Sequence, residues 1–437
     1  MTRFRACAVA GVRYQHAVKS ATFGTRGGSR GRGVRGVRSV VVAAVLAAGA
    51  SLGLACSADE TPMSDDLESD LTSFRSSADP LEDRDFADDL DRRFIRAASA
   101  NLDEAAFSKK WDASLESSVL FMRAYPAAYH ADLLQIPTKR ILGAEGLCFG
   151  DAHPDNFGFL NVGGATVFSF NDLDDAGYCP IAFDAARYFA VLRLYFDDKD
   201  LSAEVLEQYV DTVKDPLRAV WLTSSAAPDW AAVRASVLAD WTRGDSLALG
   251  GELSALEGPE REAVLRVAGA DPTLSTYRVL DLAAFARNAG GSGGLRRYWL
   301  LVEKGSGAAT RRTILELKET ATPGAAFGRH SKQLPIASRL TTLKSTFWGG
   351  SPNDDYFHVS LLGGRFLVRD RATKKSVKLD PKGGKATIDV LRAQASVMAR
   401  HQSKYWRSVK KDDLRAWLHA SSKTLAHRWR DTYEAAR

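Results

Sequence analysis

Three polar residues, Asp151, Asn156 and Asp172, have the types and spacing that phosphoryl transfer to a hydroxyl group requires. Such a transfer needs a carboxylate that orients the hydroxyl group and accepts its proton, and Asp151 can serve as this base. It also needs oxygen ligands for Mg²⁺. Asn156 follows Asp151 by five residues, so one loop can carry both, and Asp172 begins a second acidic segment. We therefore expect Asn156 and Asp172 to hold Mg²⁺ beside Asp151.

Two further residues of this region have supporting roles in the same interpretation. His153 is expected to brace the loop that carries Asp151, rather than to transfer protons. Asp184 falls in the first turn of a predicted helix, where a carboxylate can accept hydrogen bonds from backbone N–H groups of the loop. The alternative is a polar turn followed by a solvated acidic loop. The ordered series of motifs from Gly150 to Asp184 disfavours that alternative.

A glycine-rich segment, 290–294, lies between two predicted strands, and a third predicted strand ends in Lys318. Dinucleotide-binding and P-loop glycine motifs would open a helix instead, so neither is indicated. A strand, glycine loop and strand followed by a lysine-bearing strand can cover nucleotide phosphates and contact them with an ammonium group. A flexible hairpin turn would look the same as the loop alone. The residues expected to bind phosphate are Gly290, Gly291, Ser292, Gly293, Gly294 and Lys318.

Apolar periodicity predicts an α+β protein with five segments. They are a leader (1–56), a disordered tether (57–85), a mainly helical part with the Asp151 and Asp172 loops (86–274), an antiparallel β lobe (275–370) and a C-terminal helical part (371–437). Strands are expected at 147–149, 157–161, 166–170, 279–286, 297–303, 313–318, 356–361 and 365–368. Helices are expected within 86–134, at 180–196, three times within 201–270, and at 331–343, 388–401 and 412–433.

The basic character of the chain comes from its first residues. Nine Lys or Arg residues fall within 1–38, and subtracting them from the net charge of +6 leaves −3. Nothing therefore favours nucleic acid or an anionic membrane surface as a partner, and we expect a monomer. A short apolar run, 40–54, follows the basic stretch and ends before Cys56, as in a bacterial lipoprotein signal. The expected location is outside the cytoplasm, with Cys56 lipidated, and the alternative is a cytoplasmic protein whose leader does not function.

Two cysteines remain beyond this leader, Cys148 and Cys179, on either side of the Asp151 and Asp172 motifs. An exported protein permits a disulfide between them. Two free, structural thiols are the slightly preferred interpretation.

The motifs together resemble the protein-kinase-like superfamily and its aminoglycoside-phosphotransferase branch. The segment Gly150-Asp151-Ala152-His153-Pro154-Asp155-Asn156-Phe157-Gly158, then Asn171-Asp172-Leu173-Asp174, a glycine-rich hairpin and Lys318-Glu319, resembles more closely a bacterial family known as domain of unknown function 2252. The resemblance implies a two-lobed kinase-like fold. Because the Asp151 and Asp172 motifs precede the glycine loop, it also implies circular permutation.

The resemblance implies ATP or another nucleotide and Mg²⁺ as cofactors. Two departures are visible: Ser169 stands where the family has an acidic residue, and no acidic residue between Thr320 and Asn353 can pair with Lys318 as a helix Glu does in kinases. Glu316 or Glu319 is the expected substitute. The leading hypothesis is a phosphotransferase acting on an unknown hydroxyl group of a small molecule or protein. The alternative is a non-catalytic nucleotide-binding or scaffold lipoprotein.

Overall fold

The computed structural model of the protein describes residues 75–86, 89–196, 199–222, 226–307, 310–328, 334, 336–350 and 356–437. The predicted leader, with Cys56, and most of the predicted tether lie outside these residues. The lipoprotein signal and the lipidation of Cys56 therefore stay predictions. Among the described residues, no helix combines the length and the apolar character that crossing a membrane would need.

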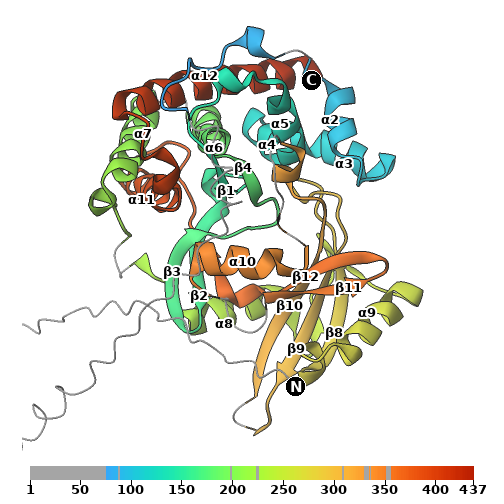
Figure 1. Ribbon diagram of the computed structural model, residues 1–437. Coiled ribbons are helices and arrows are strands. Elements are labelled where there is room, and N and C mark those ends of the chain that lie inside the picture. The colour runs from blue at the N-terminus through green and yellow to red at the C-terminus, as the bar shows by residue number, and fades with distance from the viewer. Residues whose placement is uncertain are drawn as a thin grey trace, which may run out of the picture. The chain divides into compact units, whose positions relative to one another are not determined.

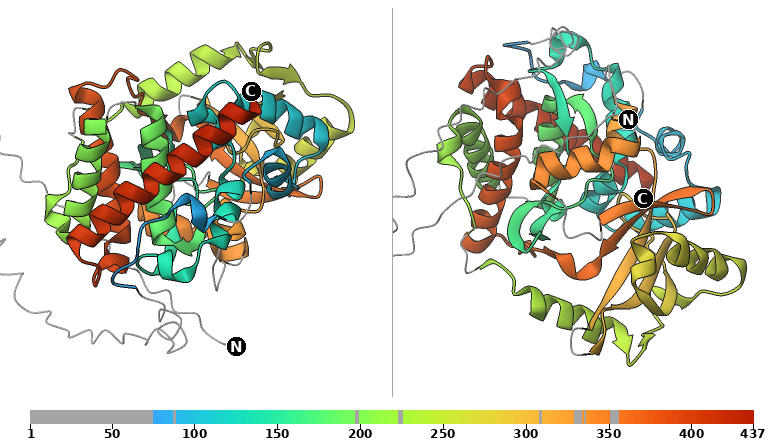
Figure 2. Two further views of the ribbon diagram at one scale, coloured as in Figure 1. Left: turned by 90° about the horizontal axis from the view of Figure 1, so that it is seen from above. Right: turned by 60° about the horizontal axis from the view of Figure 1, so that its bottom comes forward.

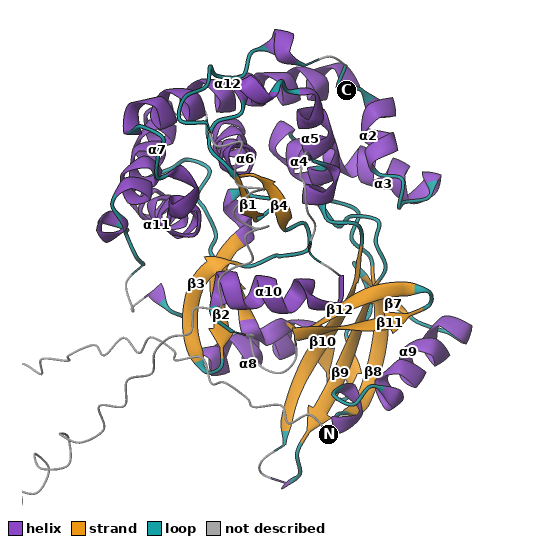
Figure 3. Ribbon diagram, in the orientation of Figure 1, coloured by secondary structure: helices purple, strands orange, loops and turns teal. Residues whose placement is uncertain are grey.

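Most helices gather on one side of the molecule, away from the largest sheet (Figure 1 and Figure 3). The longest, α12, runs along this helical part and contacts α6, α7 and α4 (Figure 2). Helix α6 is its centre, because every residue from Ile181 to Leu192 is buried. The helices are α2 (Arg92–Ala98), α3 (Glu104–Ser114), α4 (Ser118–Ala124), α5 (Pro126–Asp132), α6 (Ile181–Tyr195), α7 (Lys199–Lys214), α11 (Lys385–Gln402) and α12 (Lys411–Ala436).

The largest sheet is antiparallel throughout and has the strand order β11-β12-β10-β9-β8-β7. Its strands are β7 (Leu253–Ala255), β8 (Arg278–Phe285), β9 (Arg297–Lys304), β10 (Arg311–Thr320), β11 (Tyr356–Leu361) and β12 (Gly364–Asp370). Helix α9 (Gly258–Ala270) packs on one face, and α8 (Trp230–Trp241) packs on the other against Phe285 and Trp299. The sheet and the helices together confirm the predicted α+β class.

Smaller sheets carry the predicted functional loops. Strand β1 (Glu145–Cys148) pairs with β4 (Gly177–Pro180), and β2 (Phe157–Val162) pairs with both β3 (Ala165–Phe170) and β13 (Lys374–Ser376). The Asp151 loop leaves β1 and enters β2, and the acidic segment 172–175 connects β3 to β4. Helix α10 (Ile336–Trp348) packs beside β3, where the Ser169 hydroxyl donates to the Phe347 backbone O at 3.1 Å. A two-stranded ribbon of β5 (Thr242–Arg243) and β6 (Ser246–Leu247) follows α8.

The preference for free thiols at Cys148 and Cys179 is wrong, because the structure joins them in a disulfide with a Cα–Cα distance of 5.8 Å. The antiparallel register of β1 and β4 sets Cys148 opposite Gly177 and Cys179 opposite Gly146, so the two cysteines are diagonal neighbours. Cys148 precedes the Asp151 loop and Cys179 lies in β4, after the acidic segment. The cross-link therefore ties the start of the Asp151 loop to the strand that follows Asp175. The two sulfurs also lie within 4.8 Å of an Asp184 carboxylate oxygen, but bonded sulfurs have no thiolate to offer a metal.

Loss of this disulfide is expected to lower the free energy of unfolding by about 3 to 4 kcal/mol, because the bond closes a loop of roughly 31 residues in the unfolded chain. Urea unfolding of the wild type and of the Cys148→Ala/Cys179→Ala variant checks this, each with and without reductant. Reductant should lower the wild-type midpoint and leave that of the variant unchanged. Equal wild-type midpoints in the two conditions would contradict the cross-link.

Candidate active site

Asp151 is a buried carboxylate that three side chains hold in place. Arg187, on α6, donates to its Oδ1 from Nη2 at 2.6 Å and from Nε at 3.1 Å. The side-chain amide of Asn156 donates to Asp151 Oδ2 at 3.2 Å and to its backbone O at 3.0 Å, and His153 Nε2 lies 3.4 Å from Oδ2. Burial opposes ionisation, but His153 and Arg187 outweigh it and hold the pKa of Asp151 below its ordinary value. The carboxylate is therefore ionised at neutral pH, and its lowered pKa makes it a weak proton acceptor.

The backbone before Asp151 takes a conformation that only glycine permits. Gly150 has φ +77°, and a Cβ atom there would lie 1.8 Å from the backbone O of Asp175. Asp184, fully buried at the start of α6, accepts from the backbone N–H groups of Phe149 at 3.1 Å and Gly150 at 3.0 Å. Gln402 donates to the same carboxylate at 2.7 Å. These contacts fix where Asp151 leaves β1.

The ring of Phe149 packs against His401, which lies at the end of α11. The ring centroids are 6.0 Å apart, and His401 also lies edge-on to Phe347. Burial first, then Arg400 and Lys404, lower the pKa of His401 to about 4. The folded state therefore holds a neutral imidazole.

This depressed pKa predicts an acid-sensitive contribution to stability. An unfolded histidine gains its proton near pH 6.5, whereas His401 in the folded chain gains it near pH 4. The contribution is therefore present above pH 6.5 and is lost as the pH falls toward 4, by about 1.4 kcal/mol per pH unit. When the pH is lowered from 7 to 4.5, the unfolding free energy of the wild type should fall by about 2 kcal/mol more than that of His401→Leu. Urea titration at each pH measures both changes. Parallel pH dependences would refute this assignment.

Lys318 and Asp172, which are 146 residues apart in the sequence, are in contact. The Lys318 ammonium lies 3.2 Å from Asp172 Oδ2 and also forms an ion pair with Asp174. Burial opposes the ionisation of Asp172, but Lys318, Lys374 and Arg369 hold its pKa below the ordinary range. The backbone N–H of Asn171 donates to the backbone O of Asn156 at 2.8 Å. The acidic segment therefore begins beside the loop of Asp151.

The partner of Lys318 is not the one expected from the sequence. Glu316 lies on the same face of β10 but forms ion pairs with Arg297, Arg369 and Arg371. Glu319 is held by Arg296. The helix that follows β10 is α10, and its Arg339 donates to backbone oxygens of the acidic segment. Asp172 and Asp174 are thus the anions that neutralise Lys318.

The glycine-rich loop between β8 and β9 lies against Asp151. A Cβ atom on Gly291 would be 3.4 Å from Asp151 Oδ2 and 3.6 Å from Asp175 Oδ2. The Gly291 backbone O accepts from the buried ammonium of Lys110 at 2.7 Å. Gly293 and Gly294 close the turn through backbone bonds to Gly290 and Arg287, and Ser292 accepts a hydrogen bond from Arg297. The loop thus approaches the predicted base within contact distance.

Three charged residues of this site were not predicted from the sequence: Lys110, Arg187 and Lys374. For Asp175, in the acidic segment, the sequence left open whether it supports the site or is simply solvated. Burial lowers the pKa of Lys110 to about 8, against the opposing effect of Asp175 and Asp151. Burial, with the charges of Asp151 and Asp174, raises the pKa of Asp175 to about 7. Burial and Arg369 lower the pKa of Lys374 to about 7. For Arg187, the sequence signal was its position about one turn after Asp184 on α6.

One comparison with known proteins gives a match. The family model described as "Uncharacterized protein conserved in bacteria (DUF2252)" matches residues 102–227. This span includes Asp151, Asn156, Asp172 and Arg187, whereas the glycine loop and Lys318 lie beyond it. No curated protein and no solved structure matches the chain.

Proposed function

We propose that the protein is a phosphotransferase that moves a phosphoryl group from a nucleotide to a hydroxyl group. The observation that carries the proposal is the contact of Lys318 with Asp172 and Asp174, beside a glycine loop that lies on Asp151. Phosphoryl transfer is catalysed mainly by positioning and by stabilisation of charge, and these residues supply a base, anionic metal ligands and a phosphate-binding cation in one place. The acceptor is not identified by these residues.

Each residue has a defined role in this proposal. Asp151 accepts the hydroxyl proton, and Arg187 keeps its carboxylate ionised and oriented. Asn156 and Asp172 offer the hard oxygen ligands that suit Mg²⁺, which would neutralise charge on the nucleotide phosphates when bound. Lys318 and the backbone of 290–294 hold those phosphates. His153 and Asp184 position the loop.

We further propose that the fold is a circularly permuted form of the protein-kinase-like fold. The order β8, glycine loop, β9, β10 with Lys318 and then helix α10 is the order of the equivalent kinase parts. In this chain it follows the Asp151 and Asp172 loops, whereas in kinases it precedes them. Asp174 would take the place of the helix glutamate that kinases pair with this lysine.

A second candidate function is non-catalytic nucleotide binding by a scaffold lipoprotein. Two observations favour it: the Asp151 carboxylate is occupied by Arg187 and Asn156, and Gly291 leaves little space beside it. Under both candidates we propose a monomer that is exported, binds no nucleic acid and meets the membrane only through a lipidated Cys56. A cytoplasmic location is the alternative, and it would supply ATP directly.

A nucleotide screen by thermal shift tests the proposal on the protein lacking residues 1–56. We expect at least one nucleoside triphosphate to raise the melting temperature in the presence of Mg²⁺, because a ligand that binds only the folded state stabilises it. The same nucleotide without Mg²⁺ should have a smaller effect. If no nucleotide changes the melting temperature under either condition, both candidate functions fail.

A further inference from the structure

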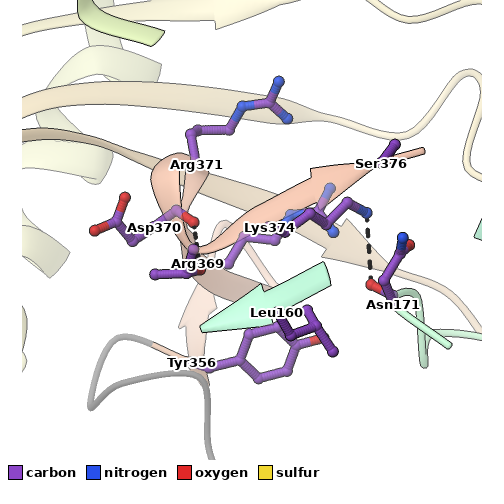
Figure 4. A pocket seen from close by; sticks show the side chains of 9 residues that line it. Leu160, Asn171, Tyr356, Arg369, Asp370, Arg371, Lys374 and Ser376 are labelled. Atoms are coloured by element: carbon purple, nitrogen blue, oxygen red, sulfur yellow. Dashed lines mark hydrogen bonds between the residues drawn. The ribbon is translucent and has the colours of Figure 1, made fainter. Parts of the chain in front are cut away.

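A small cavity opens beside the acidic segment, where β12 leaves the large sheet and continues into β13 (Figure 4). Its volume is about 120 Å³. In Figure 4 the Lys374 side chain points toward Asn171, and the ring of Tyr356 lies beside Leu160. The lining residues are Leu160, Asn171, Tyr356, Arg369, Asp370, Arg371, Thr373, Lys374 and Ser376.

Several polar atoms of this lining have no hydrogen-bond partner among the described residues. They are Nδ2 of Asn171, the hydroxyl of Tyr356, Nη1 of Arg369 and Nε of Arg371. Asn171, Tyr356 and Arg369 are only 2%, 4% and 6% exposed, respectively. Buried donors are normally paired, so a group of them around one cavity indicates a ligand that accepts hydrogen bonds.

The lining carries more basic than acidic side chains. Arg369 and Arg371 contribute two cations, and Glu316, which does not line the cavity, pairs with both. Lys374, with its pKa lowered to about 7, is partly protonated at neutral pH, and an anion bound beside it would favour the ammonium form. The one carboxylate in the lining, Asp370, already accepts from Arg234 at 3.0 Å, from the Thr313 hydroxyl at 2.6 Å and from the backbone N–H of Ala372 at 2.8 Å. It therefore does not neutralise Lys374.

We propose that this cavity binds a phosphate-type oxyanion. Several oxygens on one centre can accept simultaneously from the Asn171 amide, the Tyr356 hydroxyl, the Arg369 guanidinium and the Lys374 ammonium, which a single chloride or water cannot do as fully. The cavity is several times larger than the roughly 30 Å³ that one water molecule occupies in the liquid, so a phosphate group fits. An apolar ligand would leave the donors without partners.

Oxyanion binding in this cavity does not depend on the proposed phosphoryl transfer. Asn171 and Lys374 place it next to Asp172, so an anion held here would contribute charge close to the predicted metal ligand. Binding of free phosphate needs neither a nucleotide nor Mg²⁺. A chain that transfers no phosphoryl group can therefore still bind the oxyanion, and the two proposals fail independently.

Calorimetric titration with inorganic phosphate, without Mg²⁺ and at fixed ionic strength, tests the site. Chloride and acetate at the same ionic strength measure the general salt effect. We expect phosphate to bind the wild type, Lys374→Met to weaken the affinity at least tenfold, and Tyr356→Phe to weaken it severalfold. Lys375→Met is the matched control, because Lys375 is the next residue of β13 and is exposed, and it should bind like the wild type.

Three results would overturn the proposal. They are the absence of phosphate binding by the wild type, equal affinities of Lys374→Met and Lys375→Met, and acetate or chloride heats equal to those of phosphate. Circular dichroism of each variant verifies folding. Should Lys374→Met not fold, Tyr356→Phe decides, because it removes one hydroxyl group and keeps the ring in place. Asp172→Ala should bind phosphate at least as tightly as the wild type, because it removes a negative charge that interacts with Lys374 and Arg369.

Discussion

Replacing Asp151 by Asn is expected to reduce nucleotide turnover by about three orders of magnitude, because an amide cannot accept the hydroxyl proton. Nucleotide affinity should stay within about threefold of the wild type. Asp151 is assigned to the hydroxyl group that accepts the phosphoryl group, whereas the nucleotide phosphates are assigned to Lys318 and 290–294. Release of phosphate or nucleoside diphosphate, followed with saturating Mg²⁺ and nucleotide, measures the turnover.

The matched control for this substitution is Asp155→Asn, which changes the same group in the same loop. Asp155 forms an ion pair with Arg123 at 2.6 Å and is more exposed to solvent than Asp151, with 29% of its side chain accessible. It should keep most of the turnover. Because Asp151→Asn leaves Arg187 buried without its anion, the melting temperature must accompany each rate. A folded Asp151→Asn variant with wild-type turnover would show that Asp151 is not the base.

Replacing Lys318 by Met is expected to weaken nucleotide binding about a hundredfold and to destabilise the free protein by about 3 kcal/mol or more. The phosphates lose a cation, and the partly buried Asp172 and Asp174 lose the ammonium group that neutralises them. Mg²⁺ can neutralise the same aspartates. It should therefore raise the melting temperature of Lys318→Met more than that of the wild type.

The matched control here is Lys304→Met, at the far end of the neighbouring strand β9, where the ammonium lies over the Tyr277 ring. It should bind nucleotide like the wild type and gain no extra stability from Mg²⁺. If Lys318→Met and Lys304→Met respond equally to Mg²⁺, then Lys318 does not neutralise a metal site.

The secondary structure was predictable where the sequence pattern is long and periodic. Strands such as β10 and helices such as α6 lie within a few residues of their predicted ranges, because their apolar side chains follow the period of the element. Strands β4, β5, β6, β7 and β13 were missed, because two to four residues are too few to show a period. The pairing of β4 and β13 depends on β1 and β2, which are distant from them in the sequence.

The candidate site was predictable only where a motif has a fixed local spacing. Asp151, Asn156 and Asp172 could be named because neighbouring residues identify them. Arg187 and Lys110 could not, since only the packing of α6 and α3 brings them to Asp151 and Gly291. The preference for free thiols failed for the same reason: pairing of Cys148 with Cys179 depends on the register of β1 and β4.

Calorimetric titration of the best nucleotide from the screen, with and without Mg²⁺, into the wild type and Asp172→Ala tests the central claim most directly. We predict that Mg²⁺ strengthens binding to the wild type at least tenfold and has no such effect on Asp172→Ala, because the variant lacks the anionic metal ligand. Wild-type binding that is the same with and without Mg²⁺, or an equal gain from Mg²⁺ in Asp172→Ala, would contradict the assignment of this site to metal-dependent phosphoryl transfer.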